Sequence, residues 1–317
     1  MKSKNIAVLF PQSQFSPVQL ERLASLGKVS FIKNISFNSS IKCPKDTEVL
    51  VFSPDIVGGV AKAKNRLWQI LESLPNIKYL VLSNSDYSFV DLEYCRQRNI
   101  IISDVPFYDV ESKTEHIISL LLGCTRRIFI NDRRTYRRKY NPELGHNFKD
   151  ITLGVIGINH LGEKVVELAK IFGCVVNFYD EKTIRIEGAC RQTLDTLLND
   201  SDIIALCLTK NEENKKFLNK EKIKKLKEGS MVVNIGDRDW VDEKAMNEAL
   251  INRKVDTYCF EGASLINSPL KENEFAIMLK PFSTYTKETL EKNMEAMVMN
   301  IEGIVRDLPF NSVELYR

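Results

Sequence analysis

Residue types that build metal centres and disulfide frameworks are scarce in this sequence. There are three histidines, His116, His146 and His160, which excludes a histidine-rich metal site, and we expect no metal cofactor. The seven cysteines form no C-x-x-C pair, and several lie within apolar runs. This pattern favours a cytoplasmic protein with buried, reduced thiols over a secreted disulfide scaffold.

Long apolar runs and a strong net charge are also lacking. No run approaches the ~18 residues of a membrane-spanning helix, so we expect no membrane partner. The amino-terminal MKSKNIAVLF contains a five-residue apolar run, which is typical of a first strand and too short for a signal peptide. A net charge of +3, with 44% apolar and 27% charged residues over 317 positions, indicates an ordinary globular protein of two domains.

The main concentration of positive charge lies between Arg126 and Lys139. Tyr136 and Tyr140 alternate with its basic residues, a pattern that can favour nucleic-acid contact. Asp132 and the acidic remainder of the chain offset this charge, so a solvated face or a subunit-contact arm is the preferred interpretation. We therefore expect no nucleic-acid partner.

The most informative stretch runs from Lys149 to Asp180. A short apolar run, Thr152–Ile156, has the length of one buried strand, and a glycine turn follows it. Apolar residues then recur at helical spacing until Gly173, and a second strand ends at Asp180. Strand, glycine turn, helix, strand and acid follow one another as a dinucleotide-binding βαβ unit requires.

Each part of this unit has its own physical role. Gly157 lets the chain turn out of the strand, and Gly162 lets the helix pack closely on the sheet. The start of the helix, at His160 and Leu161, offers free backbone N–H groups and a positive dipole end to a diphosphate. Asp180 is placed to bind the ribose hydroxyls and to repel the additional phosphate of NADP, so the expected cofactor is NAD.

Asn159 departs from this fingerprint, which has a glycine at that place. Asparagine tolerates left-handed backbone angles better than most residues, yet its side chain takes room that the diphosphate needs. Two interpretations follow: a working nucleotide site, which we prefer, or a βαβ unit that has kept its shape and lost its ligand.

Short apolar strands alternate with helices along most of the chain, which predicts an α/β fold with parallel sheets. A single long helix is expected over Val110–Tyr140, and a final long helix over Glu288–Asp307.

In its motifs and their order, the chain resembles the D-isomer-specific 2-hydroxyacid dehydrogenases over nearly all of its length. The matching segments are ESKTEHIISLLLGCTRRI, TLGVIGINHLG, SDIIALCLTKNEENKKFLNKEKIKKLKEGSMVVNIGDRDWVDEKAM and YTKETLEKN. The resemblance implies two Rossmann-like domains, with an NAD-binding domain over 104–285 inserted into a discontinuous, flavodoxin-like substrate domain over 1–103 and 286–317. It also implies a small-molecule substrate, and a homodimer formed through the 110–140 helix and the cofactor domain.

The same likeness extends the expected ligand contacts to other loops. It implies that the cofactor is also contacted by residues after two later strands, namely Cys207, Leu208, Thr209, Ile235, Gly236 and Asp237. The loop that meets the substrate carboxylate corresponds to Ser83, Asn84 and Ser85.

The catalytic positions differ from the family pattern. The arginine that holds the substrate carboxylate, in a V-N-x-x-R-G pattern, corresponds to Asp237, and Arg238 stands one residue later. The acid–base glutamate and histidine correspond to Ala263 and Phe282. At ~4 Å and an effective dielectric near 20, two carboxylates repel each other by about 4 kcal/mol, which disfavours ordinary 2-hydroxy acids as substrates.

Two functional hypotheses follow. The first is an NAD(H)-dependent oxidoreductase with altered substrate or chemistry, in which Asp237, with Arg238 beside it, holds an amine, imine or other non-acidic substrate. The second is a catalytically inactive NAD(H)-binding protein that acts as a dimeric sensor or scaffold. The first is preferred, because charged and aromatic replacements indicate a reshaped pocket as much as a decayed one.

Hydride transfer to a ketone needs a proton donor near the carbonyl oxygen. The candidates in this chain are Tyr285, Glu261, Tyr258 and His116. Each has a structural alternative: the tyrosines as packing residues, Glu261 as a solvent-exposed loop acid, and His116 as a hydrogen-bonding residue near a helix start.

Overall fold

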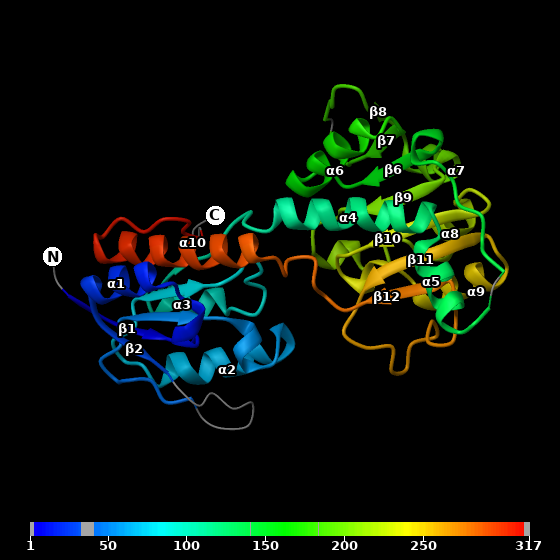
Figure 1. Ribbon diagram of the computed structural model, residues 1–317. Coiled ribbons are helices and arrows are strands. Elements are labelled where there is room, and N and C mark those ends of the chain that lie inside the picture. Colours follow the sequence, from blue (N-terminus) through cyan, green and yellow to red (C-terminus); the bar gives the residue numbers. More distant parts are fainter. Residues whose placement is uncertain (1–2, 33–40, 140, 183, 314–317) are drawn as a thin grey trace. The chain divides into compact units, whose positions relative to one another are not determined.

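The computed structural model of the chain describes residues 3–32, 41–139, 141–182 and 184–313. The chain divides into two compact units (Figure 1). Unit 1 comprises Met1–Tyr108 and Lys287–Arg317, and unit 2 comprises Asp109–Thr286. Each unit is a parallel sheet with helices on both faces, which confirms the predicted α/β class.

Unit 1 contains a five-stranded sheet in the order β2-β1-β3-β4-β5, in which all neighbouring strands are parallel. This is the strand order of flavodoxin-like folds. Its strands are β1 (Lys4–Val8), β2 (Gly27–Phe31), β3 (Val49–Phe52), β4 (Tyr79–Leu82) and β5 (Ile101–Ser103). Its helices are α1 (Pro17–Leu26), α2 (Val60–Glu72), α3 (Leu92–Gln97) and α10 (Lys287–Val305), with 3-10 turns η1 (Gln12–Gln14) and η2 (Pro54–Val57).

The two faces of this sheet follow from the alternation of side chains along a strand. In β1, Ile6 and Val8 point to the face that α1 and α10 cover, whereas Ala7 points to the face that α2 and α3 cover. The last helix of the chain, α10, thus packs on β1, the first strand. The carboxyl-terminal segment therefore completes unit 1.

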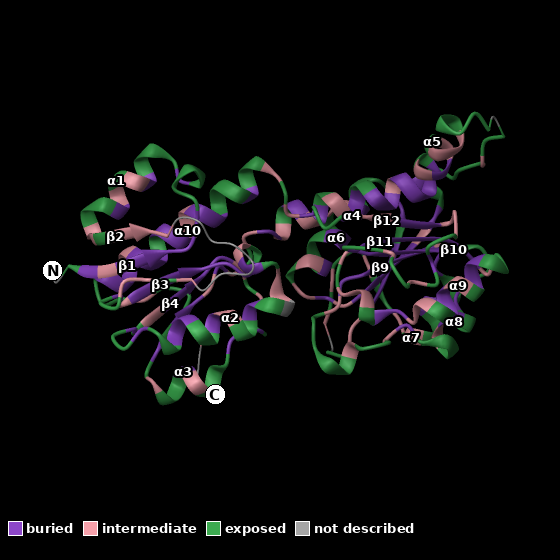
Figure 2. Ribbon diagram, turned by 90° about the horizontal axis from the view of Figure 1, so that it is seen from below, coloured by how far each residue is buried: buried purple, intermediate pink, exposed green. Residues whose placement is uncertain are grey.

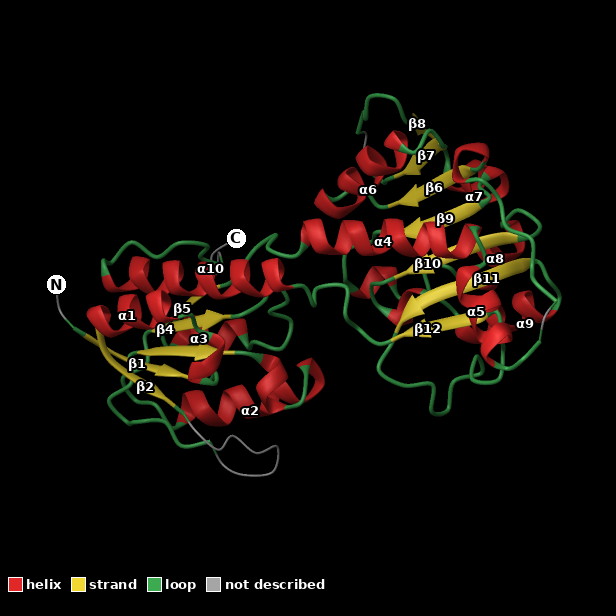
Figure 3. Cartoon of the chain, in the orientation of Figure 1, coloured by secondary structure: helices red, strands yellow, loops and turns green. Residues whose placement is uncertain are grey.

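Unit 2 contains a seven-stranded parallel sheet in the order β12-β11-β10-β9-β6-β7-β8 (Figure 3). Its strands are β6 (Thr152–Ile156), β7 (Val175–Tyr179), β8 (Cys190–Arg191), β9 (Ile203–Leu206), β10 (Ser230–Asn234), β11 (Val255–Glu261) and β12 (Ala276–Leu279). Its helices are α4 (Val110–Thr125), α5 (Ile128–Tyr136), α6 (His160–Ile171), α7 (Leu194–Asp200), α8 (Lys220–Lys225) and α9 (Glu243–Ile251), with 3-10 turns η3 (Phe148–Asp150), η4 (Glu212–Asn214) and η5 (Arg238–Trp240).

Two apolar layers enclose this sheet. The helices α4 and α6 cover one face, and α7, α8 and α9 cover the other. The central strands are buried along their whole length, as Figure 2 shows, because both faces carry helices. Among the described residues, no helix combines the length and the apolar composition that crossing a bilayer requires.

The single helix predicted over Val110–Tyr140 is wrong, because the chain breaks it into α4 and α5. At the break, Arg127 adopts left-handed backbone angles with φ of 57°. Its buried guanidinium pairs with the Asp256 carboxylate and donates to Thr257 Oγ1 at 2.9 Å, so a contact with β11 stabilises the turn. Tyr140 lies outside the described residues.

Candidate cofactor and active site

The candidate residues of unit 2 gather at one edge of its sheet. Because the strands are parallel, their carboxyl ends lie at the same edge, which is where ligands bind in open α/β sheets (Figure 3). The residues that follow successive strands there are Asn159 after β6, Asp180 after β7, Lys210 after β9, Asp237 after β10, and Phe282 after β12, while Glu261 ends β11.

The glycine turn after β6 has the close packing that a dinucleotide fold requires. Gly157 has a φ of 92°, and a Cβ there would lie 2.6 Å from the carbonyl oxygen of Cys207. A Cβ on Gly162 would lie 2.1 Å from the Gly157 carbonyl oxygen, so α6 can begin this close to the strand only with glycine. The arrangement therefore fits a bound dinucleotide, with the amino terminus of α6 at the diphosphate and Asp180 at the ribose.

Asp180 keeps its place through backbone contacts. One carboxylate oxygen accepts from Ile158 N at 2.7 Å and the other from Lys182 N at 2.8 Å. Because a carboxylate oxygen accepts more than one hydrogen bond, both oxygens retain capacity for ribose hydroxyls.

Asn159 holds this turn in a way that the sequence did not predict. Its backbone is extended, with φ of −89° and ψ of −176°, so the left-handed angles that asparagine tolerates are not used here. Its Oδ1 accepts from the N–H groups of Leu161 and Gly162, both at 3.1 Å. Its Nδ2 donates to the Cys207 carbonyl oxygen at 2.8 Å. The side chain thus caps α6 and joins the ends of β6 and β9.

The other expected cofactor residues lie around this turn. His160 is exposed and Leu161 half-buried at the start of α6. Leu208, Ile235 and Gly236 range from half-buried to exposed along the same edge, and the Thr209 carbonyl oxygen accepts from Asn214. Burial raises the pKa of the Cys207 thiol to about 12, so a neutral thiol lies beneath the turn.

Asp237 has a cation beside it. Its Oδ1 accepts from Asp239 N at 3.0 Å and caps η5, and its Oδ2 lies 3.8 Å from Lys210 Nζ. Lys210 was not predicted as a site residue, because nothing local indicates that the loop after β9 approaches the loop after β10. The position that the resemblance assigns to the family's arginine therefore carries an ion pair rather than an isolated anion.

The guanidinium of Arg238 binds groups of unit 2 and is not placed as a ligand for a substrate carboxylate. Its Nε donates to Glu243 at 2.7 Å, and its Nη2 pairs with the same carboxylate. Its Nη1 donates to the Ser264 carbonyl oxygen at 2.6 Å. The guanidinium therefore joins η5, α9 and the loop after β11, and its charge is satisfied within unit 2.

Glu261 is buried, so its interpretation as a solvent-exposed loop acid is wrong. One oxygen accepts from the N–H groups of Phe282 at 3.0 Å and Ser283 at 2.9 Å, and the other accepts from Ser283 Oγ at 3.0 Å. His116 Nε2 lies 3.3 Å from the same carboxylate, an ion-pair distance rather than an aligned hydrogen bond. Burial raises the pKa of Glu261, but His116 and these donors outweigh burial and hold it below its ordinary value.

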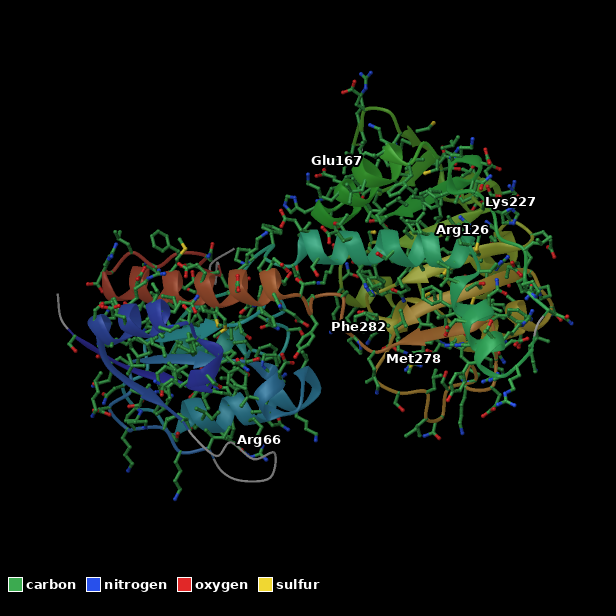
Figure 4. All side chains as sticks on the ribbon, viewed as in Figure 1. Arg66, Arg126, Glu167, Lys227, Met278 and Phe282 are labelled. Atoms are coloured by element: carbon green, nitrogen blue, oxygen red, sulfur yellow. The ribbon has the colours of Figure 1, made fainter. Side chains whose placement is uncertain are left out.

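Phe282 follows β12, at the position that the resemblance assigns to the family's histidine, and is labelled in Figure 4. Its ring packs edge-on against the His116 imidazole, with 4.9 Å between ring centroids. His116, on α4, therefore brings an imidazole beside the place where the family has one. The pairing of His116 with Glu261 was not predicted. The signal in the sequence that could have indicated it is an acidic residue at the end of a buried strand.

The two tyrosine candidates lie in opposite environments. Tyr258 is fully buried in β11 and contacts Asn234, and burial raises its pKa well above the ordinary value. Tyr285 is 77% exposed on the loop before α10. The raised pKa keeps the Tyr258 hydroxyl protonated near neutral pH, and Tyr285 lies in solvent.

The expected substrate loop belongs to unit 1. Ser83 is buried, and its carbonyl oxygen accepts from Asn293 Nδ2 in α10. The Oδ1 of Asn84 is buried without a hydrogen-bond partner among the described residues, and Ser85 is exposed.

Comparison with known families identifies the second unit. The model for the D-isomer specific 2-hydroxyacid dehydrogenase NAD binding domain matches residues 118–278, half of the chain. The 4-methyl-2-oxopentanoate reductase A of Aspergillus oryzae is 27% identical over 243 residues, which cover 73% of each chain. The D-lactate dehydrogenase of Escherichia coli is 31% identical over 193 residues, or 59% of each chain.

Solved structures agree on the fold. A glyoxylate reductase from Paecilomyes thermophila superimposes with a TM-score of 0.82 at 20% identity, over 100% of each chain. An acyclic imino acid reductase bound to NADPH and D-arginine gives 0.80 at 19% identity, over 98% of this chain and 99% of its own. A D-lactate dehydrogenase from Aquifex aeolicus with NAD and lactic acid gives 0.75 at 22% identity, over 96% of each. The chain therefore belongs to the D-isomer-specific 2-hydroxyacid dehydrogenase family, with NAD as its cofactor.

Proposed function

We propose that the protein is an NAD(H)-dependent oxidoreductase in which His116 is the acid–base group and Glu261 positions it. One observation carries the proposal: a buried, ionised carboxylate lies 3.3 Å from His116 Nε2, and this imidazole packs against Phe282, where the resemblance places the family's histidine. A carboxylate in this place stabilises an imidazolium and fixes the orientation of the ring.

The other candidate donors are less suitable. Glu261 accepts three hydrogen bonds and its pKa is lowered, so it holds no proton to donate at neutral pH. Tyr258 is buried with a raised pKa, and Tyr285 projects into solvent. His116, by contrast, places an imidazole against the Phe282 ring, with its Nε2 3.3 Å from the Glu261 carboxylate.

In the proposed reaction the bound cofactor supplies or accepts a hydride. His116 donates a proton to the oxygen or nitrogen of the reduced group, from the imidazole nitrogen that does not face Glu261, and takes it back in the oxidative direction. Glu261 stays ionised throughout, because its N–H and O–H donors stabilise the charged form.

The substrate differs from a simple 2-keto acid in this proposal. Asp237 stands where the family has arginine, and Arg238 is satisfied by Glu243 and Ser264. The Lys210–Asp237 pair presents both an anion and a cation, which suits a ketone, aldehyde or imine that carries a polar or amino group better than a bare carboxylate.

We also propose that the protein acts as a cytoplasmic homodimer. All seven cysteines are free, as expected in a reducing compartment. Exposed apolar side chains gather along α5 and the segment after it: Ile128 at 56%, Tyr136 at 89% and Leu144 at 89% exposure. Arg127 and Arg134, from the basic run, pair with acids of unit 2, which supports a structural role for this arm. A monomeric mass in analytical ultracentrifugation would refute the dimer.

A second candidate function is an NAD(H)-binding protein without turnover. The specific observation in its favour is that the Asn159 carboxamide accepts from the N–H groups of Leu161 and Gly162, at the helix start where a diphosphate would bind. Arg238, one residue after the position that the resemblance assigns to the family's arginine, is bound by Glu243 and Ser264. The turnover assay described next separates the two candidate functions.

The test follows NADH absorbance with 2-keto acids, ketones, aldehydes and imines formed from added amines. We expect turnover of carbonyl or imine compounds that lack a 2-carboxylate, and a loss of at least ~100-fold in kcat for His116→Gln. The matched control His146→Gln, at an exposed histidine of unit 2, should behave as wild type. NADH binding without turnover of any class would establish the second candidate instead.

A further inference from the structure

The start of α6 is already occupied by a side chain of the protein itself. The carboxamide oxygen of Asn159 accepts from the N–H groups of Leu161 and Gly162. These are the first-turn donors of a twelve-residue helix, and they are the kind of group that binds a diphosphate in a dinucleotide fold.

The carboxamide is held at its other end as well. Nδ2 of Asn159 donates to the Cys207 carbonyl oxygen at 2.8 Å, so the side chain bridges the glycine turn and the end of β9. The same carbonyl would lie 2.6 Å from a Cβ on Gly157, which places the bridge beside the close contact between the glycine turn and the end of β9. A diphosphate oxygen and the Asn159 oxygen cannot both accept from these two N–H groups in full.

The backbone does not require this side chain. Asn159 is in the extended region, which any residue adopts, and it is not among the positive-φ residues. Replacement by glycine or alanine therefore removes the carboxamide without forcing the turn to refold.

We propose that the Asn159 carboxamide is an internal competitor of the nucleotide diphosphate. In the ligand-free protein it caps α6 and links β6 to β9; when a dinucleotide binds, the carboxamide leaves both N–H groups and releases the Cys207 carbonyl oxygen. Affinity for diphosphate-bearing ligands is thereby reduced, while contacts of Asp180 with the adenosine ribose are unaffected. The inference concerns binding alone and holds whether or not the protein turns over a substrate.

Calorimetric titration tests this with three ligands: NADH, ADP-ribose and adenosine. Asn159→Gly should bind NADH and ADP-ribose about tenfold more tightly than wild type, a change of about 1.4 kcal/mol, and adenosine equally. Asn159→Ala should shift in the same direction, and it decides the question if the glycine variant does not fold. The matched control is Asn219→Gly, because Asn219 caps α8 through Lys222 N, away from the glycine turn.

Each outcome decides the proposal. Tighter binding of NADH and ADP-ribose, with adenosine and Asn219→Gly unchanged, supports it, as does binding that appears only in the Asn159 variants. Unchanged or weaker ADP-ribose binding by both Asn159 variants overturns it. An equal gain with adenosine also overturns it, because adenosine carries no diphosphate.

Discussion

The two halves of the carboxyl edge of unit 2 differ in how closely they follow the family. Around β6 and β7 the glycine turn and its acid match the family pattern, apart from Asn159. Around β10, β11 and β12 the positions that the resemblance assigns to the family's arginine, glutamate and histidine hold Asp237, Ala263 and Phe282. Both halves nevertheless belong to one regular parallel sheet.

The difference follows from what each position contacts. Gly162 faces the Gly157 carbonyl oxygen at a distance that no Cβ can share, so packing of the protein itself dictates the residue. Ala263 is exposed and the Phe282 side chain is 44% exposed, so packing restricts them far less. Residues that contact only a ligand can change with little cost to the fold, whereas residues that set the spacing of backbones cannot.

The largest expected effect comes from Gly162→Ala, which disrupts the close packing of α6 on the glycine turn in the first half of the edge. The new methyl group collides with a backbone carbonyl, which cannot move aside, so α6 must shift from the turn. We expect the free energy of unfolding to fall by about 2–3 kcal/mol, and NADH binding to weaken at least tenfold. Urea unfolding and NADH fluorescence titration measure the two effects.

The control for this variant is Gly229→Ala. Gly229 has a φ of 72°, and a methyl group added there would meet no atom of the described residues within 4 Å, so the variant tests backbone strain without a collision. It should lose about 1 kcal/mol of stability and keep its affinity for NADH. Unchanged stability in Gly162→Ala would show that the close approach in this half is not required.

The second half is tested with Arg238→Met. The guanidinium bonds to Glu243 and Ser264 hold η5, α9 and the loop after β11 together, and methionine keeps only the apolar stem. We expect a loss of about 2 kcal/mol in unfolding free energy, because the partly buried Glu243 carboxylate loses its partner. NADH affinity should not change.

Arg96→Met is the matched control for a charge pair without such burial. Its partner Glu93 is one helical turn away, and both side chains are more than half exposed. The loss should be small beside that of Arg238→Met, because solvent screens an exposed pair. If Arg238→Met proved as stable as wild type but raised the KM for substrate, Arg238 would belong to the substrate site rather than to the scaffold.

The sequence predicts the parts of this fold whose causes are local. The residues Pro17–Leu26 form α1 because Ser16 and Gln19 make a capping box and Pro17 starts the helix, signals that lie close together in the sequence. Likewise β6 is Thr152–Ile156, because a buried parallel strand is a continuous apolar run. The break after α4 was missed because its cause is Thr257, 130 residues further along the chain.

The candidate site divides in the same way. The glycine turn could be predicted because strand, turn, helix and acid follow one another within 32 residues of sequence, Lys149 to Asp180. The pair of His116 and Glu261 could not, because it forms only when α4 packs across the end of β11. Edge strand β8 was also missed, since two exposed residues give no apolar pattern.

The smallest expected effect concerns Glu261, in the second half of the edge, which makes the free energy of unfolding depend on acidic pH. The pKa of Glu261 is raised by burial but lowered further by His116 and the N–H donors, so it lies below the ordinary 4.5 in the folded protein. As the pH falls, the Glu261 carboxylate is therefore protonated at a higher pH in the unfolded chain than in the folded protein. The stability that Glu261 contributes is complete above about pH 4.5 and is lost as the pH falls through the folded pKa.

Glu261→Gln should remove this dependence. At pH 7 the variant should lose about 1–2 kcal/mol of unfolding free energy, since an amide cannot accept from all three donors, and its stability should decline less steeply than wild type below about pH 4.5. Urea unfolding at a series of pH values measures the difference, with Glu115→Gln, at an exposed neighbour of His116, as the control. Parallel profiles for wild type and Glu261→Gln would mean that the carboxylate is not ionised against His116. The second half would then have lost its acid–base pair together with the family residues, and the inactive candidate function would be favoured.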